Sequence, residues 1–177
     1  MVQLAMENGV WLEQLYELLS RLTAGVYTTA EGPFARGGAG KHVRHVLEHY
    51  QALLAHHSGT VDYDARERTY AIETDPRAAC SYIRDLIGGL DTLIAGDHPA
   101  GGGKPLIVRY NADAGSYPVE SSLERELMFL SSHTVHHLAL VRFILEYLGE
   151  EVPDELGVAL STLRYERESG GSTAGNT

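Results

Sequence analysis

Residues 121–148, SSLERELMFLSSHTVHHLALVRFILEYL, form a long stretch of helical periodicity. Counting 100° per residue from His133, six leucines and a valine fall between about 60° and 140°. They are Leu123, Leu127, Leu130, Leu138, Val141, Leu145 and Leu148. His137 falls at about 40° on the same count, so His133 and His137 lie within a wide apolar arc. The pattern predicts an amphipathic helix that begins at a capping box, Ser121–Glu124, and ends at Gly149.

A second row of histidines lies in residues 39–57, AGKHVRHVLEHYQALLAHH. From His42 at zero, the apolar residues of this segment fall between about 20° and 140°, which predicts a second amphipathic helix. His45 and His49 fall at about 300° and 340° on the same count. The histidines of this segment therefore flank the apolar stripe. His42 and His136 lie at the edges of their two arcs, and we expect them to be bystanders.

Two further helices complete the expected fold. Residues 8–25 carry leucines at helical spacing behind a candidate cap, Asn8, and residues 76–95 follow the strong helix start Asp75-Pro76. Four long amphipathic helices predict an all-α protein, a four-helix bundle with irregular connections.

The remaining segments predict less regular structure. LIVRY, residues 106–110, reads as a strand with a partner near residues 117–119, which would make one short β-hairpin. After Gly149 we expect an extended stretch that wraps the helices. Residues 1–168 then form a single domain, and residues 169–177 form a flexible tail.

Composition narrows the class of protein. The 177 residues fit one domain with a sizeable core, and the net charge of -10 argues against nucleic-acid or anionic-membrane binding. No apolar run approaches the roughly 20 residues that span a bilayer, and the N-terminus lacks a signal-peptide pattern, so we expect a cytoplasmic protein. The single cysteine, Cys80, can form no disulfide within the chain.

The two histidine rows predict a metal site. His133 and His137 stand at i and i+4, where two imidazoles can bind one divalent ion, and the helix at residues 39–57 offers His45 and His49 as further ligands. Imidazole ligands favour a transition metal such as Zn, Ni or Fe over Ca or Mg. The chain contains neither HExxH nor a Glu-x-x-His pair, which argues against a zincin protease and a ferritin-like di-iron site.

Several segments resemble the DinB-like (DinB/YfiT-like) family. They are GAGKHVRHVLEHYQALL, VDYDARER, ETDP before a helix, RELMFLSSHTVHHLALV and GVALSTLRYE, and they cover nearly the whole chain from residue 38 onward. The resemblance implies a four-helix bundle that binds a divalent metal. In this family one histidine of the second helix and an HxxxH pair of the last long helix hold the ion.

Carried over to this chain, the HxxxH pair is His133 and His137, and the second-helix histidine is His45. His49, one turn later, departs from the simpler pattern. It is a fourth ligand, a residue that supports a ligand, or a replacement for His45. The resemblance also implies a homodimer, and some members resemble S-transferases that use a low-molecular-weight thiol to attack an electrophilic small molecule.

Two classes of function follow from this sequence. The first is an enzyme, a metal-dependent and thiol-dependent S-transferase or hydrolase, in which three histidines leave one position on the metal open. The second is a non-catalytic protein, a metal-binding stress protein or a dimeric interaction module, for which a closed site of four histidines would be the sign. Glu126 projects from the same face as His133. It either orients a histidine or transfers a proton to substrate, or it pairs with Arg44, Arg125 or a surface lysine. The charged residues of the following connection either order that loop through ion pairs or bind an anionic substrate; they are Asp62, Asp64, Arg66 and Arg68.

Overall fold

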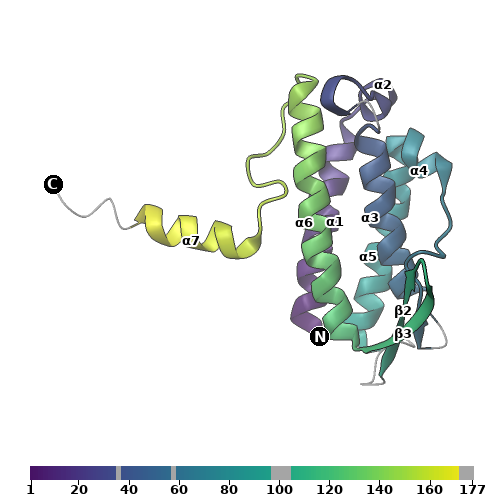
Figure 1. Cartoon of the computed structure of the whole chain (residues 1–177). Helices are drawn as coiled ribbons and strands as arrows, with labels where there is room; N and C mark the ends of the chain where they lie inside the picture. The colour runs from purple at the N-terminus through teal and green to yellow at the C-terminus, as the bar shows by residue number, and fades with distance from the viewer. Residues whose placement is uncertain (35–36, 57–58, 97–104, 172–177) are drawn as a thin grey trace.

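Four long helices form the body of the protein. The computed structural model describes residues 1–34, 37–56, 59–96 and 105–171, and it is mainly helical. The long helices, which run side by side in Figure 1, are α1 (Val2–Ser20), α3 (Ala39–Leu54), α5 (Pro76–Ala95) and α6 (Leu123–Tyr147). α1 packs against α5 and α6, and α3 packs against the same two helices. This arrangement brings α3 and α6, which carry the two histidine rows, into direct contact.

The core forms where the apolar stripes of the long helices meet. The stripe of α6 is buried as its periodicity predicts, with Leu127, Leu130, Leu138, Val141 and Leu145 all at most 1% exposed. The largest fully buried side chains are Trp11, Tyr27 and Tyr50. Because burial of apolar area is the main stabilising contribution in folding, these faces hold the helices together.

Asn8 lies inside the core, and its expected role as a helix cap is wrong. α1 begins at Val2, so Asn8 lies in the middle of the helix and is fully buried. Its Nδ2 donates to the carbonyl of Leu127 at 3.1 Å, and its Oδ1 accepts from the Tyr50 hydroxyl at 2.7 Å. Thr134 Oγ1 donates to the same hydroxyl at 3.0 Å. This network joins α1, α3 and α6 beside the histidines.

The predicted helix ends are confirmed where a local signal sets them. α5 has the expected bounds because the Asp75 carboxylate accepts from the backbone N–H of Arg77 at 2.8 Å, and Pro76 occupies the first helical position. α6 ends before Gly149, whose φ of 84° suits a glycine. Its N-cap is Ser122, which accepts from the N–H of Arg125 at 3.2 Å, so the predicted Ser121–Glu124 capping box is wrong.

Other helix bounds differ from the expectation. The helix expected over residues 8–25 is α1 followed by a separate short helix, α2 (Ala24–Thr28), because Thr23 Oγ1 accepts from the N–H of Val26 and starts a new turn. α3 ends at Leu54, before the expected end at residue 57, which lies outside the described residues. The short helices η1 (Gly32–Phe34) and α4 (Tyr70–Thr74) lie in the connections.

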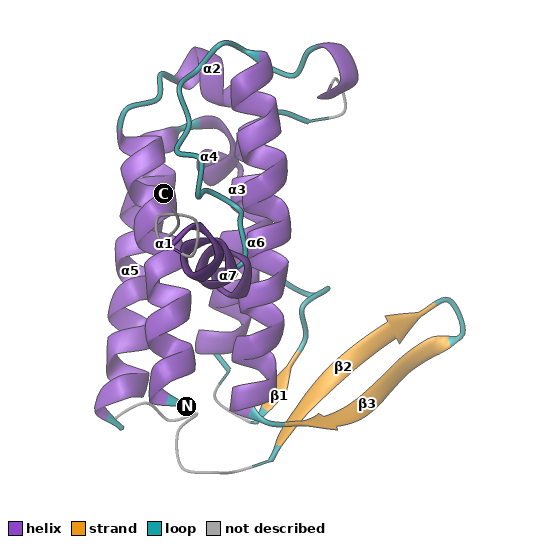
Figure 2. Ribbon diagram, turned by 90° about the vertical axis from the view of Figure 1, so that its left-hand side faces the viewer, coloured by secondary structure: helices purple, strands orange, loops and turns teal. Residues whose placement is uncertain are grey.

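A small sheet stands at one end of the helices, so the fold is mainly helical rather than all-α. The predicted hairpin is confirmed, with β2 (Leu106–Ala112) antiparallel to β3 (Gly115–Ser121). A third strand that the sequence analysis did not predict, β1 (Thr60–Val61), pairs with β2 in parallel. Figure 2 shows the hairpin projecting from the helices. The β1 pairing anchors the connection that follows α3.

The C-terminal segment contains a helix where an extended strap was expected. α7 (Leu160–Gly171) projects away from the long helices in Figure 1. Leu163, at 7% exposed, is buried against the rest of the protein, whereas the charged residues after it are exposed. The predicted tail overlaps the end of α7, and residues 172–177 lie outside the described residues. Among the helices described, none is long and apolar enough to cross a membrane.

Tyr50→Phe tests the buried network. The substitution removes the donor to Asn8 and the acceptor for Thr134, so we expect the free energy of unfolding to fall by about 1–3 kcal/mol. Urea denaturation measures it. Tyr70→Phe, at a tyrosine that is 73% exposed, is the matched control and should leave stability unchanged. Equal stabilities of the two variants would show that the network contributes nothing.

Candidate metal centre

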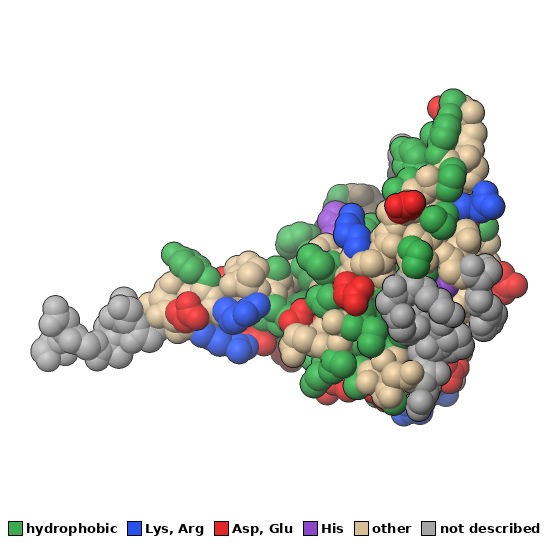
Figure 3. Space-filling view, turned by 90° about the horizontal axis from the view of Figure 1, so that it is seen from below, with side chains coloured by type: hydrophobic (Ala, Val, Ile, Leu, Met, Phe, Trp, Pro, Cys, Tyr) green, Lys and Arg blue, Asp and Glu red, His purple; other side chains and the backbone are tan. Residues whose placement is uncertain are grey.

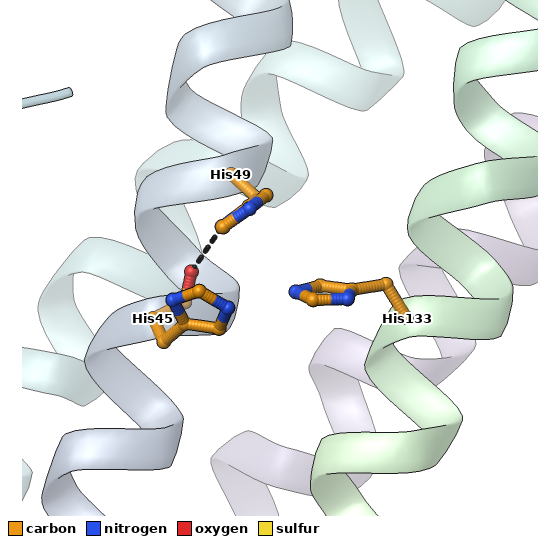
Figure 4. Close-up of side chains that lie close together, drawn as sticks. All are labelled: His45, His49 and His133. Carbon is orange, nitrogen blue, oxygen red and sulfur yellow. Dashed lines mark hydrogen bonds between the residues drawn. The ribbon is translucent and has the colours of Figure 1, made fainter. Parts of the chain in front are cut away.

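Three histidines from two helices converge on one space. His45 and His49 stand one turn apart on α3, and His133 faces them from α6, as Figure 4 shows. Each offers a ring nitrogen, and the three nitrogens lie within 4.8 Å of one another. Helical geometry explains the pair on α3, because residues i and i+4 project from one face. The contact between α3 and α6 supplies the third.

The nitrogens that face this space are poorly satisfied by the protein. His133 Nε2 is buried and has no hydrogen-bond partner. His49 Nδ1–H donates to the carbonyl of His45 at 2.6 Å, which places the proton of His49 on Nδ1 and leaves Nε2 with a lone pair. A buried polar atom without a partner costs free energy. A metal ion would satisfy both nitrogens, so the donor set fits a divalent transition metal.

His137, the fourth predicted ligand, lies beside this group. Its ring centroid is 4.6 Å from that of His133 and 4.7 Å from that of His45. Its Nδ1, however, is 3.1 Å from Nδ1 of His42, so the two rings share a hydrogen bond. His42, expected to be a bystander, therefore contacts a candidate ligand. The exposed His136 packs against the His137 ring. The structure thus brings His45 and His49 of α3 together with His133, and His137 lies beside these three.

The candidate ligands are neutral at pH 7. Desolvation by burial, with a smaller contribution from neighbouring histidines, lowers the pKa of His45 to about 3, of His133 to about 4 and of His137 to about 3. Burial also lowers the pKa of His49. A neutral imidazole is the form that binds a metal. These rings therefore need not lose a cationic proton before they bind a metal.

Two aromatic rings cover the centre on one side. The Tyr63 ring stacks on His49 with centroids 5.3 Å apart, and the Phe129 ring stacks on His133 with centroids 5.4 Å apart. The Tyr63 hydroxyl donates to Glu126 Oε2 at 2.8 Å, and the Ser121 hydroxyl donates to the other carboxylate oxygen. Burial, beside Glu126, raises the pKa of Tyr63 above its usual range. Glu126 thus positions the ring on His49, and the ion pairs expected with Arg44 or Arg125 are not among its described contacts.

An arginine reaches the centre from the connection after β1. Arg66 Nη2 donates to His45 Nδ1 at 3.0 Å, and its Nε lies 3.4 Å from a carboxylate oxygen of Glu48. Glu48 is 3% exposed, lies 3.7 Å from Arg44 Nε, and accepts from the N–H of Thr69 at 2.8 Å. Glu48 is not among the site residues predicted from the sequence. Its i, i+4 spacing from Arg44 is a local signal of an ion pair, but one that surface helices also show.

A cavity of about 360 Å³ opens beside the centre. Its lining residues are Pro33, Phe34, Gly37, Lys41, His42, Arg44, His45 and His137. One wall is apolar and another carries cationic side chains. A small molecule in this cavity would lie against the rings of His45 and His137.

Comparisons with known proteins give little further guidance. No family model and no solved structure matches the chain. Among curated proteins, FK506-binding protein 5 of Rhizopus delemar is 32% identical over 108 residues, which cover 59% of this chain. The chain spans 27% of that protein's length. This similarity assigns no family and no activity to the chain.

The lowered pKa values predict acid sensitivity of the metal-free protein. In the unfolded chain His45, His133 and His137 bind protons below about pH 6.5, whereas in the folded protein these three do so only as the pH nears 3 or 4. Stability is therefore present above pH 6.5 and is lost as the pH falls from 6.5 toward 3.

Urea midpoints measured in chelator across this range test the prediction. Because partial solvent screening reduces the effect, His45→Gln should remove only about 1 kcal/mol of the loss between pH 6.5 and 4. His136→Gln, at the exposed histidine, should behave as the wild type. A wild type and a His45→Gln variant with parallel pH profiles would contradict the assignment.

Proposed function

We propose that this chain is a DinB-like metal-binding protein whose four long helices form a bundle of the DinB/YfiT-like type. One observation carries the proposal: nitrogens of His45, His49 and His133 lie within 4.8 Å of one another, and the one on His133 is buried without a partner. Imidazole ligands favour a divalent transition metal such as Zn, Ni or Fe. The resemblance of the histidine segments to that family supports the same assignment.

The function we propose is metal-dependent transfer or hydrolysis. With three protein ligands, one position on the metal stays open, and a bound ion would supply Lewis-acid activation of a thiol, a water or a carbonyl. The protein's own residues would shape the reaction. Tyr63 and Phe129 exclude water on one side, and the cavity beside His45 admits the substrate. We propose a low-molecular-weight thiol and an electrophilic small molecule as the substrates. We also propose that the protein is a homodimer.

The alternative is a structural, non-catalytic metal site, and the position of His137 favours it. The His137 ring centroid lies 4.7 Å from that of His45 and 4.6 Å from that of His133, so His137 is the candidate for a fourth ligand. A closed tetrahedral site is typical of structural zinc. Ligand count therefore distinguishes the two functions.

The metal content of the purified protein tests the proposal directly. Protein purified without a nickel column should contain about one equivalent of a transition metal per chain, by mass spectrometry of the elements. His133→Ala should lower metal affinity at least about tenfold, because it removes one of three ligands. His136→Ala, which removes an exposed histidine from the same helix, is the matched control. Less than about 0.2 equivalents of every transition metal would overturn the proposal.

Variants of the other histidines identify the ligand set. His45→Ala and His49→Ala should each weaken metal binding, since both nitrogens belong to the converging group. His137→Ala separates the two functions. An unchanged affinity favours the open, catalytic site, and a loss of about tenfold or more favours the closed, structural site.

A further inference from the structure

The guanidinium of Arg66 determines which ring nitrogen of His45 carries a proton. A guanidinium only donates hydrogen bonds, so His45 Nδ1, 3.0 Å from Arg66 Nη2, must be the acceptor. A neutral imidazole has one protonated nitrogen, and here that nitrogen is Nε2. His45 therefore presents an N–H, and not a lone pair, on the side away from Arg66. A metal ligand needs the opposite arrangement.

His49 is arranged in the opposite way. Its Nδ1–H donates to a carbonyl, so its Nε2 keeps the lone pair. Histidines that bind metals usually have such an acceptor behind them. His49 is thus prepared as a ligand in the structure. His45 becomes one only when the ring proton lies on Nδ1, a form that cannot accept from Arg66.

The position of Arg66 is held by a buried carboxylate. Glu48 lies behind the guanidinium at 3.4 Å and is itself 3% exposed, so Arg66 is not a loosely placed surface side chain. Arg66 Nη1 also donates to the carbonyl of Tyr63. If the His45 ring turns toward a metal, these contacts still hold the guanidinium at the centre. Arg66 Nη2 then needs a new hydrogen-bond acceptor.

Charge balance indicates what the new acceptor is. Three neutral imidazoles leave the full charge of a divalent ion uncompensated, and Arg66 adds another positive charge. The two buried carboxylates of the described residues are already engaged, Glu48 with Arg44 and Arg66, and Glu126 with two hydroxyls. An anion at the centre would be attracted by both the ion and the arginine.

We propose that Arg66 is the anion-binding residue of this centre. An anionic ligand, such as a carboxylate or a thiolate, replaces His45 as the acceptor of the Arg66 hydrogen bond. The ring proton of His45 then moves from Nε2 to Nδ1, and Nε2 becomes a metal ligand. A ligand in the cavity lined by Arg44 and His45 would lie against His45, the histidine that Arg66 contacts. This inference rests on the proposed metal centre and names the charge of its substrate.

Azide binding to the cobalt-loaded protein tests the inference. Co(II) is added to metal-free protein, azide is titrated, and visible absorption reports both metal and anion binding. We expect Arg66→Gln to bind azide about tenfold more weakly than the wild type, because a charge-assisted hydrogen bond is lost. The same variant should bind Co(II) at least as tightly as the wild type in the absence of azide, because His45 is released.

Two further variants serve as controls. Arg66→Lys keeps the charge without the planar fork, so its azide affinity should lie between those of the wild type and Arg66→Gln. It also replaces Arg66→Gln as the test if that variant fails to fold by circular dichroism. Arg68→Gln, at an exposed arginine in the same connection, should match the wild type.

The outcomes separate this inference from the metal centre. Equal azide affinity in the wild type and both Arg66 variants, with cobalt bound to all three, would overturn the role of Arg66 and leave the metal centre standing. A wild type that takes up no cobalt would overturn the metal centre and this inference with it.

Discussion

α3 and α6 pack against each other with imidazoles on both facing sides, and the candidate site depends on this contact. Burying polar rings beside leucine and valine side chains costs free energy unless the ring nitrogens find partners. Directional hydrogen bonds help to set how the helices meet, because Asn8, Tyr50 and Thr134 join α1, α3 and α6 inside the core. The nitrogens of the candidate site therefore lie in a frame that these hydrogen bonds help to hold.

The residues behind the histidines give chemically identical side chains different roles. A backbone carbonyl accepts from His49, a guanidinium donates to His45, and a second histidine is paired with His137. The carbonyl and the guanidinium each have a single hydrogen-bonding role, so they determine where the protons of His49 and His45 lie. Two carboxylates support the side chains that contact these rings. Glu48 holds Arg66 against His45, and Glu126 holds Tyr63 against His49. The ring nitrogens that the candidate centre offers thus depend on residues that stand behind the histidines.

Local signals in the sequence predicted much of the helical structure. The bounds of α5 follow from Asp75-Pro76, and the hairpin follows from two alternating segments close in the chain. Non-local features were missed. Thr60 of β1 pairs with Ile107 of β2, 47 positions later, which no local pattern reports. Asn8 was interpreted as a cap because the same residue type serves caps and buried networks, and burial alone distinguishes them.

The sequence by itself determined that one histidine row flanks an apolar helical stripe and the other lies within one, and that His45, His49, His133 and His137 are the candidates. It could do so because helical periodicity sets the angle of each side chain about its own axis. The tertiary structure decided that His45, His49 and His133 converge, that His137 pairs with His42, and that Arg66 faces His45. The distance between rings on two helices depends on their axial register and crossing, which the side chains of all the packed helices set together.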